Sequence, residues 1–414
     1  MIDLVVIGGG ASGMVASIVA ARTGLKVVLI EKMEKLGRKL RITGKGRCNI
    51  TNTKEWSQFS QHIYPNTNFL RSAFYSFSNN HVIEFFNEIG LETVIERGDR
   101  VFPKSGLAKD VVDALERELR RLGVEILLNS QVTNIFDQNS IISSVELNNN
   151  QIIKCKSVIL CTGGLSYPLT GSTGDGYVMA SKLGHKIERC FPSLTALMPS
   201  AYDRSLEGLT LKNVSISLII DKDIVQTEFG DIDFTNNGIE GPIGFKISRK
   251  AVKAMINGGK VSLILDLKPS LSNDQLINRF ERDLEKMGSV NTIDYLKKVL
   301  PSQFIASFVK VSSLPDKISN RGNMERLAQA LKNVKFDVVS YTSYQRAVVT
   351  AGGISLSEIV PKTMQSKLIN NLFFAGEVID LDGDTGGYNL QIAFSTAALA
   401  AKSASYFISK QNNG

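Results

Sequence analysis

One glycine pattern near the N-terminus constrains the fold of this chain more than any other feature. A short apolar strand at Leu4–Ile7 leads into a G-x-G-x-x-G run at residues 8–13, and apolar residues then recur at helical spacing to residue 23. A second apolar strand at 26–30 ends at Glu31. A glycine run in this β-α-β setting is typical of a dinucleotide-binding domain. The sequence therefore predicts an α/β fold with a parallel sheet at its centre.

The glycines and the acid each have a physical role at such a site. Gly8 permits a tight turn, Gly10 lets a pyrophosphate approach the backbone, and Gly13 lets helix and strand pack closely. Glu31 follows Gly8 by 23 residues, where a carboxylate accepts hydrogen bonds from an unphosphorylated ribose, so FAD or NAD is favoured over NADP. The motif alone does not separate FAD from NAD. The contacts predicted here are Gly8, Gly10, Ala11, Ser12, Gly13, Glu31 and Lys32.

Basic residues concentrate directly after this motif. The formal net charge is +8, and residues 31–47 carry seven Lys or Arg against two Glu. Three interpretations compete for this stretch: a solvated loop, a nucleic-acid patch, or a site for a phosphorylated cofactor.

Composition excludes several other classes of protein. The four cysteines form no CxxC pair and there are only three histidines, which argues against a disulfide scaffold, thiol–disulfide chemistry and a histidine-based metal site. We therefore expect a cytoplasmic protein without a metal. The N-terminus does not resemble a signal peptide, and no apolar run is long enough to span a membrane.

The pattern of polar and apolar residues changes twice after Cys190. Short alternating segments over 193–265 predict a mostly antiparallel β unit, and 272–333 is polar and helical in pattern. We expect a nucleotide-binding domain of residues 1–192 and 340–414, an inserted β-rich domain at 193–270 with a return strand near 334–340, and an inserted helical domain at 271–333. Within the first domain the patterns predict helices over 67–89 and 106–122, a hairpin or meander over 131–153, and a final helix over 390–408.

Four further segments are rich in glycine and lie far apart in the chain. They are GRKLRITGKGRCNITN at 37–52, LCTGGLSYPLTGSTGDG at 160–176, VTAGGISLSEIVP at 349–361 and FAGEVIDLDGDTGGYNLQIAFS at 374–395. Together they closely resemble the bacterial flavoproteins typified by HI0933-like proteins, a family with members described as an aminoacetone oxidase and a 3-dehydro-bile-acid reductase. The resemblance implies a glutathione-reductase-like FAD-binding Rossmann domain built from both chain ends, and FAD-dependent oxidoreductase activity.

The resemblance also implies cofactor contacts in these segments. Gly44 and Gly46 allow close backbone approach, and Arg38, Lys39 and Arg47 offer positive charge to the FAD pyrophosphate or to the pyrimidine end of the reduced flavin. This role explains the basic stretch better than nucleic acid does. The other predicted contacts are Thr43, Cys48, Asn49, Val132, Thr162, Gly163, Gly164, Asp175, Gly376, Glu377, Gly387, Asn389, Leu390 and Gln391.

Several candidates have a purely structural alternative. Asp175 is either a cofactor contact or the N-cap of the helix that follows it. Cys48 lies in a cofactor segment, yet a buried structural thiol is the favoured interpretation. Tyr388 and Arg47 are the candidate catalytic residues facing a substrate, with simple packing as the alternative for Tyr388. The three histidines, His62, His81 and His185, are expected to be surface or satisfied core residues.

Three functions stay open on this sequence. The first is a redox enzyme that passes hydride between a small organic substrate and flavin N5, with NAD(P)H or oxygen as the second partner. The second is an FAD-dependent RNA-modifying enzyme, which would need a basic surface with exposed aromatics, a pattern weak at 245–260 and 317–335. The third is a non-catalytic flavin-binding or redox-sensing protein.

We predict the first function, with a small-molecule substrate and neither a nucleic-acid nor a membrane partner. The inserted modules favour it, since they would cover the flavin and form a substrate cavity. The chain has a single G-x-G-x-x-G run, so no second nucleotide-binding domain is expected and NAD(P)H would act as a transient reductant.

Overall fold

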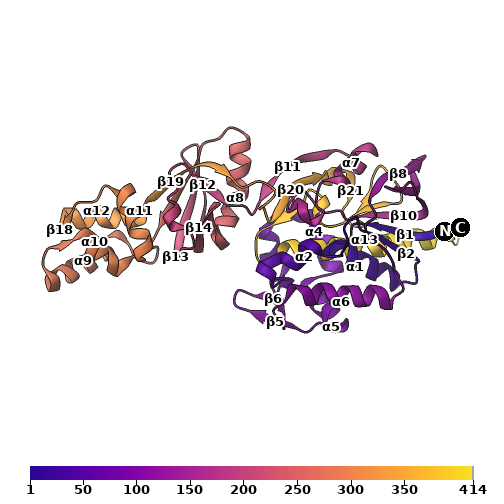
Figure 1. Cartoon of the computed structure of the whole chain (residues 1–414), viewed down its shortest axis with the longest axis horizontal. Helices are drawn as coiled ribbons and strands as arrows, with labels where there is room; N and C mark the ends of the chain where they lie inside the picture. Colours follow the sequence, from indigo (N-terminus) through magenta and orange to yellow (C-terminus); the bar gives the residue numbers. More distant parts are fainter. Residues whose placement is uncertain (413–414) are drawn as a thin grey trace. The chain divides into compact units, whose positions relative to one another are not determined.

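The computed structural model of the chain describes residues 1–412. The chain divides into two compact units (Figure 1). Unit 1 consists of Met1–Phe191 and Tyr344–Gly414, and unit 2 of Pro192–Ser343. Both ends of the chain therefore contribute to unit 1, and the further division of the insertion into a β-rich and a helical domain stays a prediction.

A largely parallel sheet forms the centre of unit 1. Its strand order is β21–β22–β23–β10–β1–β2–β7, and the five strands from β23 to β7 run parallel. Residues 4–7 of β1 and all of β2 are continuous apolar runs and are buried, as expected for strands covered on both faces. Because β23 pairs with β10, the C-terminal segment completes the sheet that the N-terminal segment begins. The bounds are β1 (Ile2–Ile7), β2 (Val27–Ile30), β7 (Glu125–Leu127), β10 (Ile152–Leu160), β21 (Ile359–Val360), β22 (Gln365–Ser366) and β23 (Leu372–Phe374).

Helices α1 (Ala11–Ala21) and α13 (Tyr388–Asn412) pack against each other beside this sheet (Figure 1). Helix α6 (Ala108–Arg121) packs on α1 and is strongly amphipathic. The helical structure predicted over 67–89 is confirmed, and it is divided between two helices, α4 (Thr67–Ser76) and α5 (Asn79–Glu88). Phe77 leaves the helical conformation, and the Ser78 hydroxyl caps α5 by accepting a hydrogen bond from the backbone N–H of His81.

Shorter elements surround the central sheet. Strands β8 (Val132–Gln138), β9 (Ile141–Leu147) and β10 form an antiparallel meander, which confirms that alternative for 131–153. Small ribbons join β3 with β6 and β5, β4 with β24, and β11 with β20. Their bounds, with those of the short helices, are α2 (Arg38–Ile42), β3 (Thr51–Asn52), α3 (Trp56–Phe59), β4 (Ile63–Tyr64), β5 (Thr93–Glu96), β6 (Arg100–Pro103), α7 (Asp175–Lys182), β11 (Ile187–Ser193), β20 (Val349–Ile354) and β24 (Asp382–Gly383).

Unit 2 contains a closed antiparallel barrel in the order β12–β15–β14–β13–β16–β19. Alternate residues of β16 are buried, as the alternating sequence predicts. The prediction of β structure is wrong for 241–256, which forms α8 (Gly241–Ile256): a proline stands in its first turn, and Ile243, Ile247 and Ala251 are buried at helical spacing. The strand bounds are β12 (Leu197–Pro199), β13 (Thr210–Ile220), β14 (Asp223–Thr235), β15 (Gly238–Glu240), β16 (Val261–Asp266) and β19 (Val334–Tyr341).

A helical segment lies between β16 and β19. It contains α9 (Asn273–Met287), β17 (Val290–Asn291), α10 (Thr292–Val299), α11 (Ser302–Ser312), β18 (Lys317–Ile318) and α12 (Arg321–Lys332). Strand β19 then pairs with both β16 and β12 and closes the barrel. Among the helices of residues 1–412, none combines the length and the apolar character that crossing a membrane requires.

Candidate cofactor site

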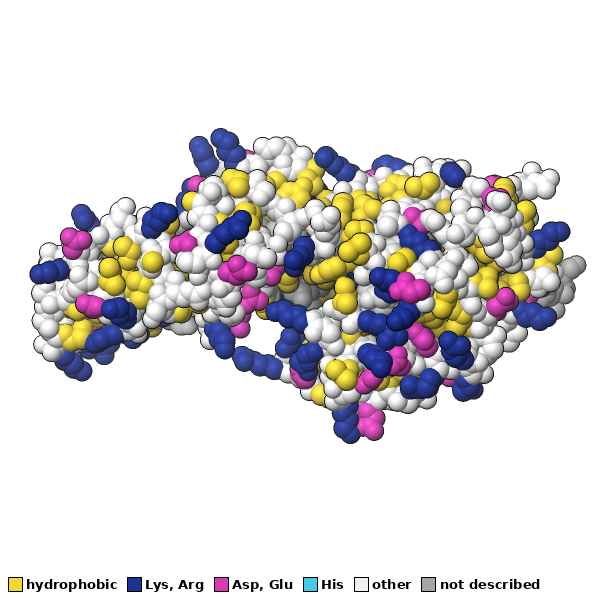
Figure 2. All heavy atoms as spheres, viewed as in Figure 1, with side chains coloured by type: hydrophobic (Ala, Val, Ile, Leu, Met, Phe, Trp, Pro, Cys, Tyr) yellow, Lys and Arg dark blue, Asp and Glu magenta, His cyan; other side chains and the backbone are white. Residues whose placement is uncertain are grey.

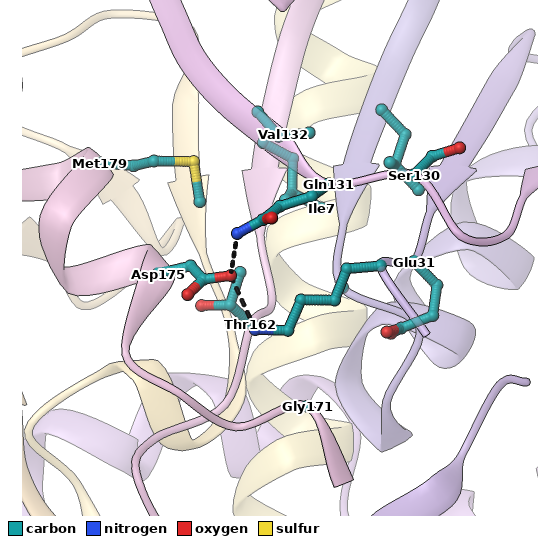
Figure 3. Close-up of a pocket in the computed structure, with 12 residues that line it drawn as sticks. Ile7, Glu31, Ser130, Gln131, Val132, Thr162, Gly171, Asp175 and Met179 are labelled. Carbon is teal, nitrogen blue, oxygen red and sulfur yellow. Dashed lines mark hydrogen bonds and ion pairs between the residues drawn. The ribbon is translucent and has the colours of Figure 1, made fainter. Parts of the chain in front are cut away.

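A pocket opens at the carboxyl ends of β1 and β2, beside the glycine run (Figure 3). Ligands of open α/β sheets bind at this edge, because the helix N-termini and the loops meet there. Its lining residues are Ile7, Gly8, Ile30, Glu31, Lys32, Ser130, Gln131, Val132, Thr162, Gly171, Asp175 and Met179. The pocket thus brings together six residues that the sequence predicts as cofactor contacts, from four separate segments: Gly8, Glu31, Lys32, Val132, Thr162 and Asp175.

The three motif glycines divide into two kinds. A Cβ on Gly8, whose φ is +104°, would lie 2.6 Å from the carbonyl oxygen of Cys161, and a Cβ on Gly13 would lie 1.8 Å from the carbonyl oxygen of Gly8. A Cβ on Gly10 would meet nothing within 4 Å. The fold itself therefore requires Gly8 and Gly13, whereas Gly10 faces open space at the N-terminus of α1. A pyrophosphate needs this space and the backbone N–H groups that point into it.

Glu31 connects the glycine run to the end of β2. Its carboxylate accepts hydrogen bonds from the backbone N–H groups of Gly9, at 2.7 Å, and of Met33, at 2.8 Å. Burial raises the pKa of Glu31, and these two hydrogen bonds offset part of the rise. A carboxylate has four acceptor positions, so Glu31 can also accept from a ribose hydroxyl.

Asp175 closes the opposite side of the pocket. One of its carboxylate oxygens lies 2.7 Å from Lys32 Nζ and accepts from Gln131 Nε2 at 3.1 Å (Figure 3). Burial alone would raise the pKa of Asp175, but hydrogen bonds from Lys32 and Thr173 bring it below its ordinary value. The N-cap interpretation of Asp175 is wrong: Gly174 is the N-cap residue of α7 and Asp175 is its first helical residue.

Thr162 supplies independent evidence for a ligand. Its hydroxyl oxygen is buried at the pocket and has no hydrogen-bond partner within residues 1–412. An unsatisfied buried hydroxyl costs roughly 1–3 kcal/mol, so such groups normally find a partner. A polar cofactor in the pocket would provide one. With the open space at Gly10 and the acid at Glu31, the residues present fit the adenosine and pyrophosphate portions of FAD.

Two glycine-rich segments from opposite ends of the chain meet in unit 1. Asn52 Nδ2 donates to the carbonyl oxygen of Gly386 at 3.0 Å, and a Cβ on Gly387 would lie 2.5 Å from the carbonyl carbon of Thr51. With its amide oriented to suit its neighbours, Asn49 accepts from the backbone N–H of Gly387 at 3.0 Å. Only glycine at 387 permits this close approach, so the segments predicted to contact the flavin form one surface.

A third group of loops converges on Glu377. Lys39 Nζ lies 2.7 Å from one of its carboxylate oxygens, and the other accepts from the backbone N–H of Thr350 at 2.9 Å. A Cβ on Gly164 would lie 2.5 Å from the Thr350 hydroxyl and 2.9 Å from Glu377 Oε1. A Cβ on Gly376 would lie 2.5 Å from Ser12 Oγ, so this group adjoins the glycine run. Thr350 joins this group although it is not among the predicted contacts, and it stands in one of the four glycine-rich segments.

The basic stretch is not a free positive patch. Figure 2 shows Lys and Arg side chains gathered over α2, with carboxylates among them. Arg38 pairs with Glu34 at 2.6 Å, and Arg47 with Glu96 at 2.5 Å. The Arg47 guanidinium also lies 4.5 Å above the Phe102 ring. These pairs reduce the charge that Arg38 and Arg47 offer to a cofactor, and they hold the loop in place.

Cys48 and Tyr388 are both packed inside the protein. Cys48 is fully buried and burial raises its pKa to about 12, so it is a structural thiol. Tyr388 is 3% exposed, and its ring lies 4.9 Å from that of Phe59 and 4.5 Å from that of His62. Burial raises the pKa of Tyr388, which keeps its phenol neutral. This packing favours the structural alternative for Tyr388.

The other predicted contacts lie in the same loops. Gln391 is fully buried, accepts from the Thr51 hydroxyl at 2.6 Å and donates to the carbonyl oxygen of Phe77 at 3.0 Å, so its side chain ties α13 to the fold. Ala11 and Ser12 lie in the first turn of α1, Thr43, Gly44 and Gly46 after α2, Gly163 after β10, and Asn389 and Leu390 in the first turn of α13. Within residues 1–412, no group of three or more His, Cys, Asp and Glu side chains could hold a metal ion.

One close pair of residues, His62 and Asp384, includes a member that no sequence motif marks. His62 Nδ1 lies 2.8 Å from Asp384 Oδ2, and the two residues are 322 positions apart. Asp384 stands in the DGDTGGYN run, which marks it as a candidate, but nothing around His62 does.

The family described as HI0933-like protein Rossmann domain matches residues 2–403. The chain belongs to this family. A 3-dehydro-bile acid delta(4,6)-reductase of Clostridium scindens is 30% identical over 405 residues, which cover 96% of this HI0933-like chain and 98% of the relative. Ribosomal RNA dihydrouridine synthases of Haemophilus influenzae and Escherichia coli are 29% and 28% identical, and each alignment covers 97% of this chain and 98% and 97% of the relative.

Solved structures agree with the predicted fold of this HI0933-like protein. A 3-ketosteroid delta1-dehydrogenase from Sterolibacterium denitrificans aligns with a TM-score of 0.55 at 13% identity, covering 98% of this chain and 99% of that one. A 3-ketosteroid-delta4-(5alpha)-dehydrogenase from Rhodococcus jostii gives a TM-score of 0.52 at 13% identity, covering 98% and 96%. The predicted family and the FAD-binding Rossmann fold are confirmed, and the protein is an FAD-dependent oxidoreductase.

Proposed function

We propose that this protein is a reductase that saturates a carbon–carbon double bond conjugated to a carbonyl group in a small organic substrate. The observation that carries the proposal is the near-full-length match to relatives with different named substrates. A delta(4,6)-reductase of a 3-dehydro bile acid and a dihydrouridine synthase share one bond change, because both names describe hydrogen added to a double bond near a carbonyl. The alignments span the whole chain rather than the nucleotide motif alone.

Each part of the site has a role in this proposal. When bound and reduced, FAD would supply a hydride from N5. Glu31 would hold the ribose, Gly10 and the N-terminus of α1 the pyrophosphate, and the loops around Glu377 and Gly387 the ribityl chain and the flavin. Because the chain has a single G-x-G-x-x-G run, we propose that NAD(P)H binds transiently as reductant and leaves before the substrate enters. We place the protein in the cytoplasm, where its four free cysteines stay reduced.

The test follows the flavin absorption band without oxygen. The FAD-loaded protein is reduced photochemically and then mixed with cyclic enones or with saturated ketones of the same ring size, and the oxidised protein is mixed separately with primary amines. We expect enones alone to restore the oxidised spectrum and to yield a product carrying two more hydrogens by mass spectrometry. Reduction of the oxidised flavin by an amine, with peroxide formed in air, would make the protein an oxidase and refute the proposal.

A second candidate is the same reduction on uracil bases of RNA. The two dihydrouridine synthase relatives favour it, and so does α8, which carries Lys246, Arg249, Lys250 and Lys253 and no acidic residue. The test incubates the reduced enzyme with ribosomal RNA fragments and measures dihydrouridine by mass spectrometry. Loss of this product in K250E/K253E, with reduction of small enones unchanged, would support the RNA substrate.

A further inference from the structure

The pair formed by His62 and Asp384 lies outside the pocket that fits the adenosine and pyrophosphate of FAD. The imidazole Nδ1 lies 2.8 Å from Asp384 Oδ2, and their side chains are 23% and 9% exposed. No hydrogen bond to the other ring nitrogen, Nε2, occurs within residues 1–412. One nitrogen is therefore fixed by a buried carboxylate while the other is free in a partly exposed ring, and this arrangement suits proton transfer.

The backbone holds this pair rigidly. Strand β4, which follows His62, pairs with β24 through Tyr64 and Asp382, and the backbone N–H of Asp384 donates to the carbonyl oxygen of His62 at 3.0 Å. The imidazole also packs against the Tyr388 ring, with centroids 4.5 Å apart. A side chain fixed on three sides can present Nε2 in one direction.

The pair adjoins the surface predicted to contact the flavin. Asp384 is two residues from Gly386, whose carbonyl oxygen accepts from Asn52, and three from Gly387, which lies against Thr51. Lys54 Nζ lies 5.8 Å from the centre of the Tyr388 ring that supports the imidazole. The pair therefore stands at the flavin end of the site rather than at the adenosine pocket.

The other two histidines differ from His62 in this respect. Both ring nitrogens of His185 have partners, the carbonyl oxygen of Ala180 and the hydroxyl of Ser366. His81 belongs to the capping box of α5 and bonds to Ser78. His62 differs from both, because the only hydrogen-bond partner of its ring within the described residues is an acid that orients it.

We propose that His62, oriented by Asp384, delivers the proton that completes reduction of the substrate double bond. This inference rests on the proposed function. The hydride goes from the reduced cofactor to the carbon remote from the carbonyl, and the proton goes from Nε2–H to the carbon next to the carbonyl. His62 is left neutral with Nδ1–H donated to Asp384, and it regains its proton from water. NAD(P)H then restores the reduced cofactor, so hydrogen atoms and electrons balance.

The test separates the two half-reactions in H62Q, D384N and the control H81Q, all loaded with FAD. Glutamine is itself a favourable capping-box residue, so H81Q keeps the cap of α5. We expect FAD affinity and reduction by NAD(P)H to be unchanged in every variant. Reoxidation by 2-cyclohexenone should slow by roughly 10²–10⁴-fold in H62Q, the usual contribution of a general acid. In D384N it should slow by about 10–100-fold, the effect known for carboxylates that orient metal-bound histidines.

Two further readouts distinguish proton delivery from a structural role. Wild type should show a solvent deuterium isotope effect on reoxidation that changes in H62Q. The chain has only three histidines, so ¹⁵N spectra of labelled protein resolve each ring, and neutral His62 should carry its proton on Nδ1 in wild type.

Each result decides the question. Wild-type reoxidation rates in H62Q, or a His62 proton found on Nε2 in the neutral ring, would overturn the inference and leave the proposed reductase standing. A wild-type enzyme that no enone reoxidises would refute the reductase, and the inference with it.

Discussion

Two glycines of the same motif allow cofactor binding to be separated from folding. A methyl group on Gly10 meets nothing within 4 Å, whereas one on Gly13 would lie 1.8 Å from a backbone oxygen. We expect G10A to cost the cofactor-free protein no more than about 1 kcal/mol, because Gly10 is the N-cap residue of α1 and alanine is less favourable there. We expect G13A to lose about 3 kcal/mol, the upper end of the cost of overpacking, since a backbone oxygen cannot move aside easily.

For FAD affinity we expect the opposite order: G10A should weaken FAD binding directly, whereas G13A should act on it only through stability. In G10A the added methyl group occupies the space of the pyrophosphate and displaces it from backbone donors. Losing one or two charge-assisted hydrogen bonds costs about 3 kcal/mol, which corresponds to a roughly hundredfold weaker Kd. The folded fraction of G13A should bind FAD with wild-type affinity, so its apparent affinity should fall only in proportion to the fraction of unit 1 that is unfolded.

The assay uses a single reporter of unit 1. Trp56 is the only tryptophan in the chain, and its ring lies 5.1 Å from that of Phe74. Its fluorescence therefore follows urea unfolding of unit 1 in the cofactor-free protein, and FAD affinity comes from quenching of flavin fluorescence. If G10A bound FAD with wild-type affinity, or destabilised the cofactor-free protein as much as G13A, the assignment of the open space to the pyrophosphate would be refuted.

Three other predictions follow from buried groups of unit 1. T162V removes a hydroxyl that has no partner within residues 1–412, so it should leave the urea midpoint of the cofactor-free protein unchanged or higher and weaken FAD binding. Burial lowers the pKa of His185 in the folded protein, so the unfolded chain takes up a proton at this residue first as the pH falls. The contribution of His185 to the free energy of unfolding is therefore complete above about pH 6.5 and is lost as the pH drops through the lower folded pKa. H185Q should lack that part of the pH dependence of unfolding, and an unchanged pH profile would contradict the assignment. Burial raises the pKa of Cys48 to about 12, so iodoacetamide at pH 8 should leave its peptide unlabelled until urea is added, as judged by mass spectrometry.

The sequence predicted the parts of the fold that depend on local patterns. Three features depend on residues close together in the chain: the glycine run, the apolar strands on either side of α1, and the final helix. The spacing of their residues was therefore sufficient to predict them. Helix α8 was missed because its segment follows a long alternating region and is enclosed by strands. The break between α4 and α5 was missed because Phe77 and Ser78 interrupt the helical pattern for only two residues.

Side-chain partners were the least predictable part of the site. Lys39 and Glu377 are separated by 338 residues, and His62 and Asp384 by 322. Such pairs depend on which strands become neighbours, and a single sequence carries little information about that. The basic stretch was expected to face the cofactor, but Glu34 pairs with Arg38 from four residues away, and tertiary folding brings Glu96 to Arg47 from 49 residues away.

The joining of both chain ends in one sheet has a consequence for synthesis on the ribosome. Strand β10 acquires its neighbour β23, and α1 its neighbour α13, only from residues after 343. All the strands of the barrel lie within 192–343, so the barrel can form while the first 191 residues still lack their partners.

The last 71 residues take roughly 4–14 s to make at 5–20 residues per second. During this interval the apolar face of α1 and one edge of β10 are uncovered. The segment that is made first is therefore the last to reach its final structure, and it depends on protection from aggregation until the C-terminal helix emerges.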